Sequence, residues 1–333
     1  MAVQIRPAAV SDLPQMTALL IQDAAQRQQT NPALWPLAAN GLERVANAVR
    51  KTVESSEPPF AEQWLVAEEA GRIVGISHAL KVPVPPIYAG AFGPPGLLLD
   101  DCFAVADAPP DTEEMLLLAT EAALRHSGAE LLLASCLATG RRDSFLQQHG
   151  YNAITLYLGK AGLAADDTAS NVRPAAAEDV PGIVAASAQH RDTLAEISYR
   201  FWQTHPEADG RFAAWMQRSL TLTDRDMFVD EAQGQVAGYL IAQPISPLLV
   251  PVAHDIRKIG VIDDFYHADF AEINAVANEG VGAAYLLQAA ESAFAARQVD
   301  ATFVVCPAGW PSKISVLAQQ GYQPAKVWLL KEP

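Results

Sequence analysis

The stretch Ile5-Arg-Pro-Ala-Ala-Val-Ser-Asp-Leu-Pro14 decides the fold, because it returns later in the chain as Val172-Arg-Pro-Ala-Ala-Ala-Glu-Asp-Val-Pro181. In each stretch an extended Arg-Pro segment leads to an aspartate, Asp12 or Asp179, where a helix N-cap is expected. A strand followed by a helix is therefore predicted at the start of two similar units.

Three further blocks repeat in the same order. The first pair joins two apolar runs through an acidic, Gly-containing turn, which is typical of a β-hairpin. The pairs are Trp64–Gly75 with Met227–Gly238, Leu98–Phe103 with Val261–Tyr266, and Leu146–Tyr151 with Leu317–Tyr322. The offsets run from 163 residues (Trp64 to Met227) to 171 (Leu146 to Leu317), which indicates a tandem duplication.

The chain has 333 residues, half of them hydrophobic, which is enough for two domains with separate cores. The last apolar strand of the first copy is predicted at 154–158. We therefore expect one domain over residues 1–162, a linker over 163–170 and a second domain over 171–333. Within each copy, strands and helices follow in an order that predicts an α/β fold with a mixed sheet flanked by helices.

The formal net charge of −15 disfavours a nucleic acid or an anionic membrane surface as partner. A cationic small molecule or a peptide amine is compatible with it, as is a homodimer. Cys102, Cys136 and Cys306 are far apart and the histidines are scattered, so no metal site is expected. Residues 1–16 lack a basic segment followed by an apolar run, so we expect a cytoplasmic protein.

The stretch Ala277–Leu287 places two glycines, Gly280 and Gly282, at the start of a helix predicted over residues 280–297. Glycine is common near helix ends, so one interpretation is a weak first helical turn. The other is a phosphate cradle, because unpaired N–H groups at a helix start attract anions and a missing Cβ lets them approach. The spacing alone does not decide between the two.

The order of these blocks resembles the GNAT superfamily (general-control-related N-acetyltransferases), and the resemblance covers nearly all of both copies. In that family a Gly-containing loop heads the main helix and a Gly-aromatic pair follows the last helix. Gly280-Val-Gly282 matches the loop, and Gly150-Tyr151 and Gly321-Tyr322 match the pair. The resemblance implies two tandem GNAT-like domains, each a mixed, mostly antiparallel twisted sheet flanked by helices.

The second copy departs from the family pattern in three places. Ala277 stands where the loop usually has a basic or amide residue, and the connection leading to Gly280 is longer than usual. Leu317 stands where the family often has a tyrosine that protonates the departing thiolate, as does Leu146 in the first copy. The general acid is therefore missing or supplied elsewhere.

The first copy departs further. In place of the glycine loop it has residues 106–115, with two prolines that lack an N–H and four acidic residues that repel a pyrophosphate. We expect this copy to have no coenzyme A phosphate site and to form one wall of an acceptor cleft.

The resemblance implies direct transfer of an acetyl group from acetyl-CoA to an amine of a small molecule or peptide, using the second copy. Residues implied to contact acetyl-CoA are Phe265, His267, Ala268, Asn278, Glu279, Gly280, Val281, Gly282 and Ala283.

Three residues of the second copy are candidates for the base, namely Asp263, Asp264 and His267. Adjacent aspartates on a strand point to opposite faces, so one reaches the cleft while the other is buried or solvated. The first copy repeats the Asp-Asp pair but not the histidine, which favours His267 as the base at neutral pH and a structural role for one aspartate. Tyr266 is the candidate proton donor to the thiolate.

Two other classes of function stay open. One is a non-catalytic acyl-CoA sensor or interaction protein, which the missing tyrosine and the altered first copy favour. The other is a pure scaffold, which the long connection before Gly280 favours.

Overall fold

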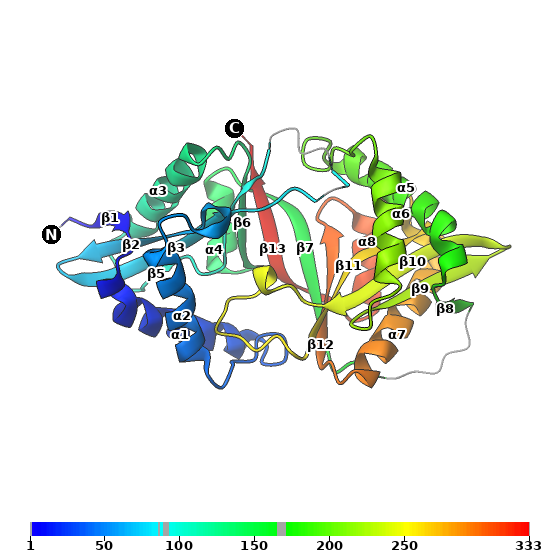
Figure 1. Cartoon of the computed structure of the whole chain (residues 1–333), viewed down its shortest axis with the longest axis horizontal. Helices are drawn as coiled ribbons and strands as arrows, with labels where there is room; N and C mark the ends of the chain where they lie inside the picture. Colours follow the sequence, from blue (N-terminus) through cyan, green and yellow to red (C-terminus); the bar gives the residue numbers. More distant parts are fainter. Residues whose placement is uncertain (1, 86, 89–92, 165–170, 333) are drawn as a thin grey trace.

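A computed structural model describes residues 2–85, 87–88, 93–164 and 171–332, and a single 13-stranded sheet runs through it (Figure 1). The first copy contributes β1 (Gln4–Pro7), α1 (Leu13–Thr30), α2 (Gly41–Glu54), β2 (Gln63–Glu69), β3 (Arg72–Lys81), β4 (Gly96–Leu98), β5 (Phe103–Ala104), α3 (Thr112–His126), β6 (Leu132–Leu137), α4 (Arg141–Gln148) and β7 (Asn152–Ala161). The second contributes β8 (Val172–Pro174), α5 (Val180–Ile197), α6 (Ala208–Ser219), β9 (Asp226–Ala232), β10 (Gln235–Pro244), β11 (Ile259–His267), α7 (Val281–Ala296), β12 (Ala301–Pro307), α8 (Pro311–Gln319) and β13 (Gln323–Lys331).

The sequence predicts, in each copy, a strand, a helical region and a hairpin, followed by a strand, a helix, a strand, a helix and a last strand, and the structure confirms this order in both copies. The hairpin turns are Ala70-Gly71 and Gln233-Gly234, and all four residues have positive φ, as two-residue hairpin turns of type I′ require. Of the predicted linker, residues 165–170 lie outside the described residues.

Helices cover both faces of the sheet. In the first copy α1 and α2 lie below the strands in Figure 1 and α3 lies above, while in the second copy α5 and α6 lie above and α7 lies below. Among the described strands, only β4 with β6 and β11 with β12 pair in parallel, so the sheet is mixed and mostly antiparallel, as predicted.

The two copies exchange their last strands at the centre of the sheet, where the order is β6-β13-β7-β12. Strand β7 of the first copy pairs along the whole of β12, and β13 of the second copy pairs with β6. In Figure 1 these two strands lie side by side between the halves. The sheet hydrogen bonds therefore join the copies into one folded unit.

Ion pairs also connect each exchanged strand to a helix of the other copy. Lys331 of β13 donates to Glu121 of α3, and Lys160 of β7 donates to Glu291 of α7 at 2.7 Å. The tyrosine of each Gly-Tyr pair also donates to the glutamate of its own copy, as Tyr151 does to Glu121 at 3.0 Å. The repeated Gly-Tyr motif thus anchors the junction between the copies.

Each copy has one pair of parallel strands that separate along their length, β4 and β6 in the first copy and β11 and β12 in the second. Strands β4 and β6 are paired only over Gly96–Leu98, and β11 pairs with β12 only over Ile259–Ile262. Beyond these points the strands diverge, and the residues after each Asp-Asp pair lose a neighbour on one side. The two divergences are the candidate sites.

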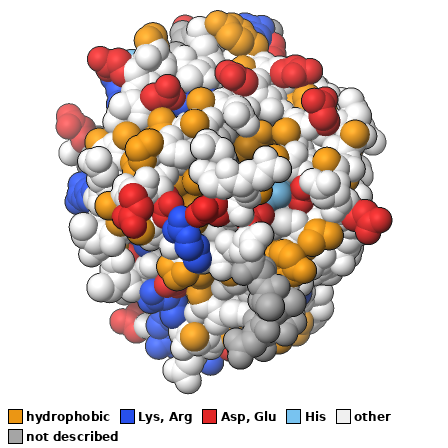
Figure 2. Space-filling view, turned by 90° about the vertical axis from the view of Figure 1, so that its right-hand side faces the viewer, with side chains coloured by type: hydrophobic (Ala, Val, Ile, Leu, Met, Phe, Trp, Pro, Cys, Tyr) orange, Lys and Arg blue, Asp and Glu red, His pale blue; other side chains and the backbone are white. Residues whose placement is uncertain are grey.

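Acidic side chains are scattered over the end of the molecule formed by the second copy, with few basic ones among them (Figure 2). Within the described ranges, no helix combines the length and apolar character that crossing a membrane requires.

Candidate functional site

The predicted phosphate cradle of the second copy is filled by the protein itself. Asp269 lies below the first turn of α7 and accepts hydrogen bonds from the backbone N–H groups of Gly282 (2.9 Å) and Ala283 (3.2 Å). Asn278 donates to the other carboxylate oxygen at 3.0 Å, and Asp269 is only 2% exposed. A buried carboxylate therefore occupies the position where an anion would bind, and its charge repels a phosphate.

The glycine at position 282 has a packing reason. A Cβ there would lie 2.5 Å from the ring of His267 and 2.8 Å from Asp230. The bare backbone makes room for the histidine, so the glycine spacing does not require a ligand.

His267 is held on both ring nitrogens. Its Nδ1 accepts the backbone N–H of Asp269 at 3.0 Å, and its Nε2 lies 3.0 Å from Asp230 Oδ2. The side chain is buried, and the lone pair on Nδ1, the one that could accept a proton, already accepts the hydrogen bond from Asp269. These contacts argue against the predicted role of His267 as a general base.

The other predicted residues of β11 are also engaged within the protein. Tyr266 is buried and donates to Gln189 at 3.1 Å. Phe265 is fully buried, and its backbone carbonyl accepts a hydrogen bond from Lys313 Nζ at 2.6 Å. Ala268 is exposed, and Val281 is half exposed. Asn278, Glu279 and Gly280 have positive φ and form the tight turn before α7.

Asp264 accepts the hydroxyl of Tyr239 at 2.7 Å and lies 3.2 Å from Nδ1 of His190. Burial opposes its ionisation, but these two hydrogen bonds outweigh burial and hold the pKa of Asp264 below its ordinary value. A carboxylate with a lowered pKa is a weak base, so Asp264 is poorly suited to remove a proton.

One expectation about this strand was wrong. The pairing of β11 with β10 skips from Asp264 to Ile262, so Asp263 is the extra residue of a β-bulge. The bulge turns both aspartates toward the same cavity, whereas regular alternation would have placed them on opposite faces.

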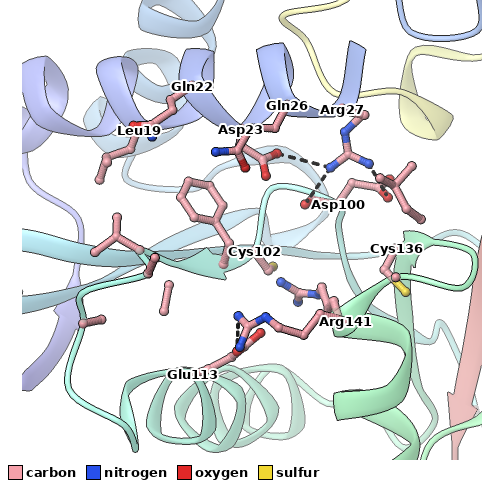
Figure 3. Close-up of a pocket in the computed structure, with 18 of the residues that line it drawn as sticks. Leu19, Gln22, Asp23, Gln26, Arg27, Asp100, Cys102, Glu113, Cys136 and Arg141 are labelled. Carbon is pink, nitrogen blue, oxygen red and sulfur yellow. Dashed lines mark hydrogen bonds and ion pairs between the residues drawn. The ribbon is translucent and has the colours of Figure 1, made fainter. Parts of the chain in front are cut away.

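The first copy has an open cleft at the equivalent place. It has a volume of about 710 Å³, within the range of small-molecule sites, and we call it the N-terminal cleft. It lies between α1 above and the first turns of α3 and α4 below in Figure 3. Its lining includes Gln22, Asp23, Gln26, Arg27, Asp100, Cys102, Phe103, Ala104, Ala106, Pro109, Glu113, Cys136, Arg141 and Arg142.

Side-chain size explains why one copy is open and the other filled. When the Asp-Asp pairs are aligned, Cys102, Ala104 and Ala106 of the first copy match Phe265, His267 and Asp269 of the second. The small residues leave space beside the diverging strands. Their larger counterparts fill that space and use its backbone hydrogen-bonding groups.

The upper wall of the N-terminal cleft carries a carboxylate. Asp23 on α1 lies 3.2 Å from Arg27, which also contacts Asp100 (Figure 3). Burial raises the pKa of Asp23 above its ordinary value despite the attraction of Arg27. Asp23 is therefore a better proton acceptor near neutral pH than an ordinary aspartate.

The lower wall carries two arginines. Arg141 pairs with Glu113 at 2.7 Å, so the first turn of α3 is not a bare acidic surface. Arg142 lies near the thiols of Cys102 and Cys136, and its buried Nε has no hydrogen-bond partner among the described residues. An unsatisfied guanidinium nitrogen in a cleft wall favours a polar or anionic ligand.

The sequence does contain a pattern that indicates the N-terminal cleft, but the glycine motif of the second copy pointed to the other copy. The segment from Cys102 to Ala106 has small residues at alternate positions, whereas the second copy has large ones. The prolines and acidic residues of 106–115 predicted that the first copy has no coenzyme A phosphate site, but the pairing of Glu113 with Arg141 was not predictable from spacing.

A scan of protein-family models finds no match to the chain, and neither does a search of curated proteins. Solved structures are similar over almost the whole chain. A tandem GNAT protein from the clavulanic acid biosynthesis pathway matches 99% of this chain and 98% of its own, at 14% identity and a TM-score of 0.51. The chain has a tandem GNAT fold.

Two other structures agree with this fold. A GCN5-related N-acetyltransferase from Sphaerobacter thermophilus has a TM-score of 0.54 and 14% identity, over 99% of this chain and 95% of its own. A glucosamine N-acetyltransferase region of a fungal multi-domain GH3 β-N-acetylglucosaminidase has a TM-score of 0.54 and 13% identity. That match covers 99% of this chain but 38% of the fungal protein. The GNAT fold thus extends through both copies.

Proposed function

We propose that this chain is an acyl-CoA-dependent N-acyltransferase in which acetyl-CoA and an amine meet in the N-terminal cleft. The observation that carries the proposal is the open divergence of β4 and β6, beside a filled divergence in the second copy. The sequence predicted the donor site in the second copy, but internal contacts of Asp269 and Lys313 fill that place, so the first copy is the better donor site. A small-molecule or peptide amine suits the acidic protein.

The residues of the cleft suit direct attack of an amine on a thioester. Asp23 is placed to accept the proton that the attacking amine loses, because its raised pKa favours proton uptake. Arg142 supplies a fixed positive charge in a partly dry wall, which stabilises the departing thiolate. Arg141, the more exposed of the two arginines, is suited to contact phosphates toward the mouth.

Thiol release from acetyl-CoA in the presence of an amine panel tests this function. We expect release by the native protein, and a loss of about 100-fold or more for Asp23→Asn, because a general base contributes about that much. Asp192→Asn is the matched control, since Asp192 is an exposed aspartate on α5. Equal activity of the native protein and Asp23→Asn would remove Asp23 from the proposal.

The non-catalytic acyl-CoA sensor stays a second candidate because one observation favours it. Leu146, at the position of the family tyrosine, is fully buried, and no tyrosine lines the described part of the cleft. Tight acetyl-CoA binding without thiol release for any amine of the panel would favour the sensor.

A further inference from the structure

A chain of charged side chains leads from the second copy to the N-terminal cleft. Lys326 of β13 donates to Asp100, which follows β4, and Arg27 of α1 contacts Asp100 in turn. Arg27 also contacts Asp23, the carboxylate in the upper wall of the cleft (Figure 3). Lys326, Asp100 and Arg27 are all buried. These contacts therefore connect a strand of the second copy to the proposed base of the first.

Arg27 is shared between Asp23 and Asp100. Its Nη2 donates to Asp23 Oδ2 at 3.2 Å and to the backbone carbonyl of Asp100 at 3.3 Å, and its Nη1 lies 3.5 Å from Asp100 Oδ1. All three distances are longer than the roughly 2.8 Å of a close charge-assisted hydrogen bond. Arg27 is therefore near Asp23 without pairing tightly with it.

This sharing suits a base in the cleft. Burial disfavours the ionised form of Asp23, and the positive charge of Arg27 favours it. A tight pair with Arg27 would make Asp23 a weaker base, whereas the loss of Arg27 would favour the protonated form of Asp23, which cannot accept a proton. The position of Arg27 therefore matters for the role of Asp23.

Lys326 is the close cation of Asp100. Its ammonium group and the hydroxyl of Ser135 both donate to Asp100 Oδ2, Ser135 at 3.0 Å. Burial opposes the ionisation of Asp100, but Lys326 and Arg27 outweigh burial and hold the pKa of Asp100 below its ordinary value. Without Lys326, the buried carboxylate would attract Arg27 more strongly and draw it away from Asp23.

Other charged or titratable groups surround Asp23 and Arg27. They are Asp101, which follows β4, His78 of β3, His254 between β10 and β11, Cys102, Arg142 of α4, and the paired Glu113 and Arg141 across the cleft. His254 is neutral near pH 7, because burial lowers its pKa to about 4. His78 contacts Asp101 and titrates closer to neutral pH, so a test must observe Asp23 itself.

We propose that Lys326 of the second copy is a positioning residue for the N-terminal cleft, because by compensating the charge of Asp100 it keeps Arg27 shared with Asp23. This inference rests on the function proposed for the cleft. It gives the second copy a part in the reaction of the first, through the exchanged strand β13.

NMR titration of the aspartate carboxyl carbons tests the proposal, with the Asp23 signal identified by its absence in Asp23→Asn. In Lys326→Met, Asp100 draws Arg27 away, so we expect Asp23 to titrate about one pH unit higher than in the native protein. The double variant Lys326→Met with Asp100→Asn leaves Asp23 as the carboxylate in direct contact with Arg27 among the described residues. Asp23 should then titrate at lower pH than in the native protein.

The opposite directions separate this role from a merely structural one. A loosened fold would admit water to Asp23 and lower its pKa in every variant. If Lys326→Met does not fold, Arg27→Gln supplies the upward shift, since it removes the shared cation and leaves Asp100 paired with Lys326. The double variant removes a buried pair as a unit, which proteins tolerate better than the loss of one partner.

Lys258→Met, at an exposed ion pair, is the control and should leave the titration of Asp23 unchanged. An unchanged or higher titration of Asp23 in the double variant would overturn the proposal. A lower titration in Lys326→Met, or in Arg27→Gln where that variant takes its place, would overturn it as well.

The pH profile of thiol release separates this inference from the proposed function. With Asp23 as the base, the acidic limb of kcat/KM should move to higher pH in Arg27→Gln and to lower pH in the double variant. Absence of thiol release by the native protein would contradict the proposed function, while the NMR titration would still test the contacts of Asp23. Thiol release with an unchanged titration of Asp23 in the double variant would overturn this inference alone.

Discussion

At the scale of single residues, one carboxylate explains why the glycine motif misleads. The glycines Gly280 and Gly282 predicted the start of a helix, and α7 does begin between them, at Val281. What spacing could not give is the position of Asp269, because a long connection folds back to place it under the first turn. Whether bare N–H groups are free depends on such a tertiary contact.

Asp12 and Asp179 show the same limit. Each was predicted as an N-cap and does precede its helix, but neither side chain caps it. Asp12 instead accepts the backbone N–H of Ala9 and pairs with Arg6 at 2.6 Å. The repeat predicted the position correctly, while the direction of the side chain required the neighbouring strand.

A pH-dependent contribution to stability is predicted at His78. Its ring lies 2.9 Å from Glu62 and 3.3 Å from Asp101. Burial opposes protonation, but the two carboxylates outweigh it and raise the pKa of His78 above 6.5. Stability from this charge is therefore fully present below about pH 6.5 and is lost as the pH rises through the raised value.

His78→Gln should therefore reduce the free energy of unfolding by about 1–3 kcal/mol at about pH 6, and by less at about pH 9. Part of the loss is independent of pH, because the ring also stacks on Trp64 at 3.7 Å. Urea unfolding at both pH values measures the difference. A loss that grows with pH would contradict the assignment.

At the scale of elements, the repeat predicted the order of strands and helices but not their neighbours in the sheet. The sequence does not say with which copy each last strand pairs. The pattern of apolar residues in β7 and β13 is satisfied equally by either partner, and only the packing of the whole sheet selects the exchange. The β-bulge at Asp263 was hidden for a similar reason, since a single extra residue leaves little trace in an apolar pattern.

The exchange places a buried ion pair between the copies. Lys326 of β13 donates to Asp100 beside β4 and to the backbone carbonyl of Leu249 at 2.6 Å. Lys326→Met should lower the free energy of unfolding by about 3–5 kcal/mol, because it removes one of the two cations beside the buried Asp100 and leaves only the longer contact with Arg27, at 3.5 Å.

Denaturant unfolding measures this effect, and Lys258→Met is its matched control. Lys258 pairs with Asp300 at 3.1 Å, but both side chains are more than half exposed, so we expect a change within about 1 kcal/mol. Equal effects of the two substitutions would show that the junction does not depend on this pair.

At the scale of the whole molecule, duplication has given two similar openings different contents. Small residues keep the N-terminal cleft open along its length, and aromatic residues, Lys313 and Asp269 leave only a shorter cavity in the second copy. One continuous sheet carries both openings. We therefore expect acyl-donor binding in the first copy and not in the second.

Calorimetric titration of acetyl-CoA into the native protein and two variants tests the location of the donor site most directly. Ala106→Trp fills the N-terminal cleft from an exposed position, and Val281→Glu adds a negative charge at the exposed start of α7. We predict binding by the native protein and by Val281→Glu, and binding at least about tenfold weaker by Ala106→Trp. Loss of binding in Val281→Glu, with native-like binding in Ala106→Trp, would contradict the account.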